Sequence, residues 1–359
     1  TRKFTLVSSD FATKFLKLAK SDKNIVSFIF LLWQNGLCGG FKMDSGNIGF
    51  VLICAAFVFV MTPGLAMFYG GLVRKKNVVN TMMTSIFIIG IGIVMWVLFG
   101  YSLSFAPSGN AFIGDFRWLG LEGVSLTEGY TDDASIPNMV FSAFQMMFAV
   151  ITPALITGAV AGRMKFKSIF VFTIFWSLIV YYPLAHMVWG QGGLLGADGI
   201  GALDFAGGDV VHISSGVSAL VLCILLGKRH DYEHSIYRIH NIPTVVLGAS
   251  LLMFGWFGFN AGSALAADGL AAHAFMTTGV SAAAAMLSWM LCDVIKNKKP
   301  TLIGASTGMV AGLVGITPGA GFVPMWAAVI IGLTTSPVCY IMISYGKKKF
   351  GFDDALDAF

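Results

Sequence analysis

Apolar stretches close to the thickness of a lipid bilayer recur along the chain, and each one ends at a glycine, a proline or a group of charged residues. A helix needs about 20 mostly apolar residues to cross the hydrocarbon core of a membrane. This criterion predicts nine membrane-spanning helices, the eighth of them short, over residues 46–69, 79–105, 136–162, 166–189, 209–227, 243–263, 269–295, 302–317 and 323–346. The expected fold class is therefore all-α, a polytopic membrane protein.

The composition excludes other classes of protein. Of the 359 residues, 56% are hydrophobic and 11% are charged, whereas soluble domains contain roughly 25% charged residues. A soluble enzyme or a nucleic-acid-binding protein could not cover so much apolar surface. The cysteines lack the CxxC spacing of a zinc site or the pattern of a disulfide scaffold; they are Cys38, Cys54, Cys223, Cys292 and Cys339. We expect no metal, no cofactor and no enzymatic activity.

Basic residues occupy every second loop between the predicted helices. Fifteen of the 23 lie on one side of the membrane: Arg74, Lys75, Lys76, Arg163, Lys165, Lys167, Lys228, Arg229, Arg238, Lys296, Lys298, Lys299, Lys347, Lys348 and Lys349. Only Arg117 lies on the other side, and the remaining seven precede the first helix. The positive-inside rule makes the fifteen cytoplasmic. We therefore expect a multi-pass protein of the cell membrane, with Met43 outside and the acidic loop from Asp115 to Asp133 external.

Residues 1–42 do not fit this pattern. They are basic, begin with Thr1, and hold one short apolar run from Ile25 to Trp33. That run is too short to span a membrane but suits the core of a signal peptide. The alternative is that translation begins at Met43 and that the preceding stretch is not native. We divide the chain into this segment and a membrane domain over 43–359.

Two short motifs recur five predicted helices apart. Ala202–Ala206 precedes the fifth helix and resembles Ala355–Phe359 after the ninth, and Pro63–Leu72 forms a weaker pair with Gly255–Leu265. Because five is an odd number, the repeated units must lie inverted in the membrane, as in many transporters. We therefore expect inverted five-helix repeats, a tenth helix just past Phe359, and a chain that is truncated at its C-terminus.

Glycine makes up 43 of the 359 residues, about 12% against a usual 7%. Gly304, Gly308 and Gly312 form a GxxxGxxxG stripe on the eighth predicted helix, and Gly158 and Gly162 have the same spacing at the end of the third. Small residues at this spacing let helices approach closely. The stripes predict a compact helix bundle and carry no information about a substrate.

His212 lies inside the apolar run of the fifth predicted helix, with Ser215, Gly216 and Ala219 on the same face. Ionisable residues inside a bilayer are costly and usually functional, and a neutral imidazole can both donate and accept a hydrogen bond. His212 is therefore a candidate for relaying a proton or a small polar solute. A structural histidine bonded between helices is the alternative, and it is our interpretation of His186.

Asp204 lies eight residues before His212, in a segment that continues with two glycines. One interpretation is a helix cap or an Asx-turn, in which the carboxylate accepts backbone N–H groups. The other is a negative charge that favours a cation at the mouth of a pore. The two interpretations are compatible.

Aromatic side chains gather toward the predicted external side. They are Phe148, Trp189, Trp256, Phe257 and Phe259, followed by the hydroxyl of Ser263. Aromatic residues at membrane interfaces ordinarily form a belt against the lipid headgroups. Rings around one vestibule could instead bind a cation through their faces, worth roughly 0.5–2 kcal/mol each.

Taken together, these segments resemble the ammonium transporter (Amt) branch of the Amt/Rh family. The strongest match to the family is the segment Asp204–Gly216, supported by Phe68–Leu72, Ala185–Gly190 and Gly255–Ser263. The resemblance extends from about Met43 to Phe359. It implies a bundle of 11 helices, of which about nine are present here, and the function of an ammonium transporter.

The resemblance also assigns residues to the external site where ammonium is recruited. Trp189, Ser263 and Phe148 match the side chains that replace the water around the ion. Asp204 matches the buried acid that supports cation binding, and Gln145 matches a polar residue beside the pore. Trp189 and Ser263 favour the Amt branch over the Rhesus branch.

Conduction is implied in the same way. Phe148 and Phe259 match a phenyl gate, and His212 matches the first of two histidines in a mostly apolar pore. In the family, ammonium loses its proton near the gate and ammonia crosses the pore into the cytoplasm. The second histidine is expected three residues after Phe359, so a twin-histidine pore is expected only beyond the residues given.

The resemblance implies partners and leaves one alternative function. Members of the family are homotrimers with one pore per subunit, and many are closed from the cytoplasm by a PII-type signal protein. The alternative is an Amt-type ammonium-sensing membrane domain of a signalling protein, with little or no transport. A signalling domain encoded after the last helix would favour the sensor, whereas a short polar tail would favour the transporter.

Overall fold

The computed structural model describes residues 43–359, apart from 108, 198 and 230–238. Over these residues the chain is helical without strands, and nine helices are long and apolar enough to cross a membrane. The expected all-α class is confirmed, and the number of candidate spans in this part of the chain equals the number predicted. The predictions for residues 1–42, and for Arg238 in the cytoplasmic loop, lie outside the described residues.

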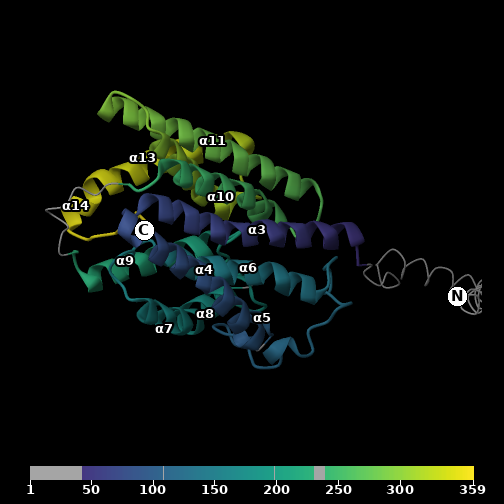
Figure 1. Ribbon diagram of the computed structural model, residues 1–359. Helices are drawn as coiled ribbons and strands as arrows, with labels where there is room; N and C mark the ends of the chain where they lie inside the picture. Colours follow the sequence, from purple (N-terminus) through teal and green to yellow (C-terminus); the bar gives the residue numbers. More distant parts are fainter. Residues whose placement is uncertain (1–42, 108, 198, 230–238) are drawn as a thin grey trace, which may run out of the picture.

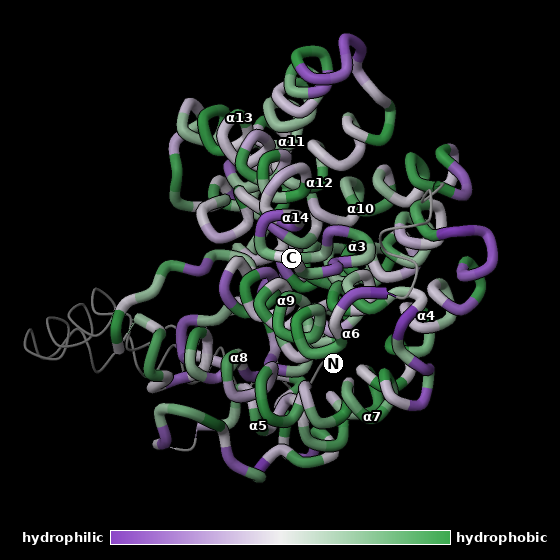
Figure 2. Tube along the Cα trace, turned by 90° about the vertical axis from the view of Figure 1, so that its left-hand side faces the viewer, coloured by the Kyte–Doolittle hydropathy of each residue, from purple (hydrophilic) through white to green (hydrophobic). Residues whose placement is uncertain are grey.

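The first five spans are α3 (Ser45–Leu72), α4 (Val78–Met95) continued by α5 (Tyr101–Phe105), α6 (Asn138–Ile156), α7 (Phe166–Trp176) continued by α8 (Tyr182–Trp189), and α9 (Ser214–Leu226). The other four are α10 (Ile242–Gly262), α11 (Gly269–Asn297), α12 (Leu302–Ile316) and α13 (Met325–Ile341), followed by the short α14 (Lys347–Phe350). Figure 1 shows the long helices lying side by side along one common direction. The tube in Figure 2 is mostly hydrophobic along the helices, and its hydrophilic stretches lie mainly at their ends, as expected of helices surrounded by lipid.

Four spans in the described chain contain one turn of π-helix. The turns are Trp96–Gly100, Ser177–Tyr181, η5 (Gly208–Ile213) and Met342–Gly346. Such turns are rare and are frequently found at functional sites. The turn η5 begins the fifth span and carries His212.

The third span ends earlier than its hydrophobic pattern predicts. Helix α6 stops at Ile156, and the residues that follow form turns up to Gly162, which has φ +74°. Glycine adopts this left-handed conformation without steric cost, and it commonly ends helices. The prediction that Gly158 and Gly162 form a stripe on a helix is therefore wrong.

The glycine stripe of α12 lies against α11, as predicted. A Cβ atom on Gly308 would stand 2.4 Å from the Cβ of Trp289, and one on Gly312 would stand 2.4 Å from the Cβ of Ala285. Contacts this short leave no room for any side chain, so the two helices can approach only through glycine. Helices α3 and α10 approach equally closely at Gly248, where a Cβ would meet the backbone nitrogen of Phe68 at 2.3 Å.

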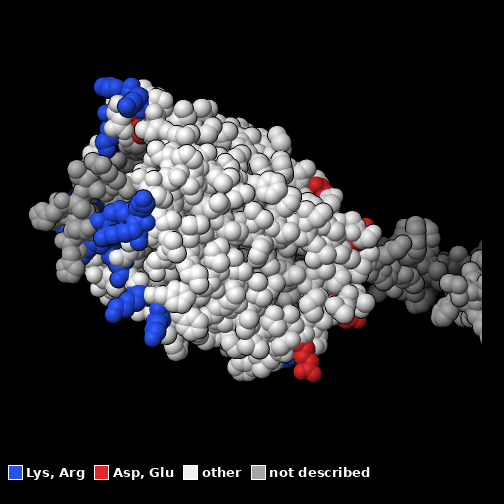
Figure 3. All heavy atoms as spheres, in the orientation of Figure 1, with Lys and Arg blue, Asp and Glu red and all other residues white. Residues whose placement is uncertain are grey.

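Charge separates the two ends of the molecule. In Figure 3 the Lys and Arg side chains gather at the end where α14 lies, and the Asp and Glu side chains gather mainly at the opposite end. The side between them carries large exposed apolar side chains, such as Leu225 at 77% and Ile179 at 69% exposure. This distribution is typical of a protein whose middle contacts lipid.

Candidate functional site

Two cavities meet inside the bundle at a pair of phenyl rings. The outer cavity, of about 440 Å³, lies toward the acidic end and includes Phe148 in its wall. The inner cavity, of about 960 Å³, includes Phe259 and extends to Arg229 at the basic end. The two rings have centroids 4.3 Å apart and are at most 1% exposed. They therefore separate the cavities.

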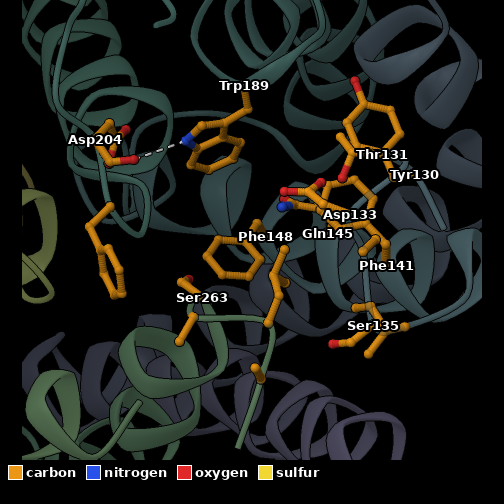
Figure 4. A pocket seen from close by; sticks show the side chains of 16 residues that line it. Tyr130, Thr131, Asp133, Ser135, Phe141, Gln145, Phe148, Trp189, Asp204 and Ser263 are labelled. Atoms are coloured by element: carbon orange, nitrogen blue, oxygen red, sulfur yellow. Dashed lines mark hydrogen bonds between the residues drawn. The ribbon is translucent and has the colours of Figure 1, made fainter. Parts of the chain in front are cut away.

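Trp189 and Ser263 stand in the wall of the outer cavity (Figure 4). Trp189 ends α8, and its ring meets that of Phe148 edge-on at 6.0 Å. Its indole Nε1 donates to the backbone oxygen of Asp204 at 3.2 Å, which fixes the plane of the ring. The hydroxyl of Ser263 donates to the carbonyl of Phe259 at 2.9 Å, so the oxygen keeps its lone pairs for a donor in the cavity.

Gln145 belongs to the same wall. It lies on α6 and is 9% exposed, and its Oε1 has no hydrogen-bond partner among the residues described. A buried amide oxygen without a partner costs free energy. The cavity beside it is therefore suited to a ligand that donates hydrogen bonds.

Asp204 acts as a cap. Its Oδ1 accepts the N–H groups of Gly207 and Gly208 at 2.6 and 2.7 Å, and its Oδ2 accepts those of Asp209 and Val210 at 2.8 and 3.1 Å. These are backbone donors at the start of η5, where helical N–H groups have no partner within the helix. The cap interpretation of the sequence is confirmed. Because both oxygens already accept two N–H groups each, the carboxylate has no lone pair left for a hydrogen bond to a ligand in the cavity.

His212 lies below the phenyl pair and lines the inner cavity. Its ring stacks on Phe259 at 5.9 Å and on Trp256 at 5.3 Å. Within the described chain its Nε2 has no hydrogen-bond partner. Gly216, one turn further on, lines the same cavity, and a Cβ there would meet no described atom within 4 Å. The imidazole therefore lines a mostly apolar space, and its buried Nε2 is left unsatisfied by the described residues.

The other aromatic and histidine residues singled out in the sequence lie elsewhere. Phe257 stacks on Phe275 at 4.2 Å and lines neither cavity. His186 is fully buried, and its two ring nitrogens lie 3.1 and 2.8 Å from the carbonyl oxygens of Ser104 and Asn110. It fixes the end of α5 and the loop after it to α8, as expected of a structural histidine.

Several wall residues of the outer cavity were missed in the sequence. Phe141 lies on the face of α6 that also carries Gln145 and Phe148, and its spacing of four and seven residues from them was a usable signal. Tyr130 stacks on Phe141 at 4.8 Å, and burial raises the pKa of its phenol to about 12. Tyr130 and Asp133 come from a loop, where no periodicity marks them.

The basic end holds a buried ion pair that was also missed. Asp353 is fully buried and receives two hydrogen bonds of 2.7 Å from the guanidinium of Arg229, with Arg163 at 3.9 Å. Burial raises the pKa of the Asp353 carboxyl, but the hydrogen bonds from Arg229 outweigh it and hold that pKa below its usual range. Within the described chain, no group of three or more His, Cys, Asp or Glu side chains could hold a metal ion.

Comparisons with known proteins agree on one family. The model of the Ammonium Transporter Family matches residues 49–359. An ammonium transporter of Bacillus subtilis (strain 168) is 53% identical over 317 residues, which make up 88% of this chain and 77% of that protein. The crystal structure of Candida albicans Mep2 superposes with a TM-score of 0.82 at 34% identity, covering 88% of this chain and 70% of that one. A structure titled "Sensor Amt Protein" superposes with a TM-score of 0.79 at 28% identity, covering 88% and 78%.

Proposed function

The chain belongs to the ammonium transporter family, and we propose that it takes up ammonium at the outer cavity and passes ammonia through the inner cavity into the cytoplasm. The observation that carries this proposal is the succession of an aromatic outer cavity, a pair of buried phenyl rings and a histidine facing an apolar space. Recruitment of the ion, loss of its proton and passage of ammonia need different side chains, and these lie along the passage in the same order.

The first step is recruitment. An ammonium ion that enters the bundle loses water, which is costly unless other groups replace it. The faces of Trp189 and Phe148 attract a cation by roughly 0.5–2 kcal/mol each. The oxygens of Ser263 and Gln145 can accept its N–H groups, because neither is saturated by the protein. Asp204 supports the site by fixing Trp189 and by its negative charge.

The second step is loss of the proton. A charge in the apolar inner cavity is expensive, whereas neutral ammonia is small and nearly free to pass. Phe148 and Phe259 exclude water and hydrated ions between the cavities. A proton released there finds the unpaired Nε2 of His212 within the same passage. Potassium is rejected because it has no proton to lose.

The proposal includes an orientation in the membrane and an assembly. We assign the acidic end with the outer cavity to the outside and the basic end to the cytoplasm, because positive residues are retained inside. The protein would act as a homotrimer with one pore in each subunit. Its basic cytoplasmic face would be the docking side for a PII-type signal protein.

The test is an ammonium-evoked current in proteoliposomes that contain the full-length protein. We expect the double variant His212→Ala, Trp189→Ala to abolish the current, because it removes both recruitment and relay. Phe257→Ala is a matched control, since that ring lies outside both cavities and its loss should preserve the current. Equal signals from wild type and the double variant would refute the proposal.

A second function is favoured by the similarity to the structure titled "Sensor Amt Protein". A sensor would bind ammonium in the outer cavity and conduct little of it. Binding without a current in the same preparation would support the sensor, and so would a signalling domain in the coding sequence beyond Phe359. A current in proportion to the amount of protein would support the transporter.

A further inference from the structure

Two carboxylates line the outer cavity, and they differ in their hydrogen bonding. Asp204 accepts four backbone N–H groups at 2.6–3.1 Å, so its charge serves the start of η5. Asp133 is exposed, and its carboxylate makes no hydrogen bond or ion pair to any described residue. Of the described residues that line this cavity, only Asp133 can therefore offer free carboxylate oxygens to a ligand.

The loop that carries Asp133 is held in place on both sides. Before it, Gln191 donates to the phenol oxygen of Tyr130 at 3.1 Å through its backbone N–H and to the carbonyl of Tyr130 at 3.0 Å through its side chain. After it, the side chain of Asn47 donates to the hydroxyl oxygen of Ser135 at 2.8 Å. The first contact ties the loop to the residues after Trp189, and the second ties it to α3. Asp133 is thus fixed at the mouth of the cavity.

The loop turns sharply at this point. The N–H of Ala134 donates to the carbonyl of Thr131 at 3.1 Å, which closes a turn around Asp132 and Asp133. Of the two neighbouring acids, Asp133 lines the cavity and Asp132 does not. Asp132 is therefore a matched control for Asp133: both carboxylates are exposed and adjacent in the chain, but only Asp133 lines the cavity.

A second observation points to a ligand that donates several hydrogen bonds. Gln145, in the same cavity, is nine-tenths buried and has an Oε1 that no described residue satisfies. Figure 4 shows Gln145, Asp133 and Trp189 around one space. An amide oxygen and a carboxylate are acceptors, and an aromatic face attracts positive charge. The complementary ligand is a small cation with several N–H groups.

We propose that Asp133 is a positioning residue that draws ammonium into the outer cavity ahead of Trp189 and Ser263. The inference rests on the proposed function, and it assigns to Asp133 the attraction that the occupied oxygens of Asp204 cannot supply by contact. An exposed carboxylate acts through the field in front of the cavity, where it raises the local concentration of cations. Such an effect is screened by salt, which distinguishes it from a structural role.

The test compares Asp133→Asn with Asp132→Asn and Asp133→Glu in the full-length protein. Ammonium-evoked currents give the half-saturating concentration, and calorimetric titration with ammonium chloride gives the dissociation constant without transport. At low ionic strength we expect Asp133→Asn to raise both by about threefold to tenfold. The maximal current should stay unchanged, and the difference should vanish at high salt. Asp132→Asn should raise both constants clearly less than Asp133→Asn does, because Asp132 does not line the cavity, and Asp133→Glu should behave as wild type.

The outcomes separate the two proposals. If Asp133→Asn matches wild type, or if Asp132→Asn shifts both constants equally, Asp133 has no special role, whereas the transport proposal stands on the wild-type current. If the wild type binds ammonium without conducting, transport fails and the titration still decides the role of Asp133. If the wild type neither binds nor conducts ammonium, both proposals are overturned.

Discussion

The region of α8 around His186 and the turn η5 around His212 both place a histidine within a membrane span, and they use it in opposite ways. Both ring nitrogens of His186 lie within 3.1 Å of backbone carbonyls, and the residue is fully buried. His212 leaves its Nε2 without a partner in the described chain and lines a cavity. We infer that a polar side chain in a span has a structural role when its hydrogen bonds are satisfied within the protein. It is available for function when a hydrogen-bonding atom is left without a partner.

The same contrast separates the carboxylates. The oxygens of Asp204 accept hydrogen bonds from backbone N–H groups, and those of Asp353 accept hydrogen bonds from Arg229. The oxygens of Asp133 accept none from the residues described. Replacing a carboxylate whose oxygens are hydrogen-bonded within the protein should mainly lower stability. Replacing a carboxylate without partners among the described residues should mainly weaken ligand binding or transport.

Asp204→Ala should have the largest effect. Four N–H groups at the start of η5 lose their acceptor, and each buried donor without a partner costs about 1–3 kcal/mol. We expect a loss of at least about 3 kcal/mol, seen as a strongly lowered melting temperature in detergent. Asp204→Asn keeps one acceptor oxygen and should lose less. Equal melting temperatures for wild type and Asp204→Ala would contradict the capping role.

His186→Leu and His212→Leu test the two histidines directly. Leucine at 186 removes the ring nitrogens that lie beside the carbonyls of Ser104 and Asn110, and with them the one N–H that a neutral imidazole donates. We expect about 1–3 kcal/mol of destabilisation. Leucine at 212 should change stability by less than about 1 kcal/mol, because no hydrogen bond is lost, but should abolish the ammonium-evoked current. Thermal unfolding and current measurements on both variants decide it. The reverse pattern would show that the hydrogen bonds do not set the roles.

Acid should produce a smaller effect through Asp353. Its pKa is lowered in the folded protein, so its pairing with Arg229 stabilises the fold above the ordinary carboxyl pKa. That contribution is lost as the pH falls through the lowered value. Melting temperatures between about pH 7 and pH 3 should fall less steeply for Asp353→Asn than for wild type. Parallel curves would exclude the ion pair as a source of acid sensitivity.

The sequence predicts the spans far better than the contacts. The hydrophobic pattern places Phe166–Trp189 and the start of α11 at Gly269 correctly, because each is bounded by charge or glycine. It misses the end of α6 at Ile156, because Thr157–Gly162 remains apolar while it turns. Hydropathy measures the affinity of a segment for lipid and not its backbone conformation.

The candidate site is predictable where chemistry is unusual in a span. His212 stands out as an ionisable residue in an apolar run, and Asp204 stands out before two glycines. The unpaired state of Gln145 depends on which neighbours reach it, and the partners of His186 lie 76–82 residues away in the chain. Asp133 sits in a loop held by distant residues, so its place at the cavity follows only from the folded structure.

Because of the π turn η5, the number of residues in Gly208–Ile213 determines which side of the fifth span faces the inner cavity. A π turn contains one residue more than an α turn, and each residue advances a helix by about 100°. Deleting a single residue within Gly208–Ile213 would leave composition and hydropathy almost unchanged. It would nevertheless rotate His212, or the whole of α9 beyond it, by roughly a quarter turn relative to the inner cavity. Insertions and deletions in this short stretch are therefore a more severe kind of variation than most substitutions.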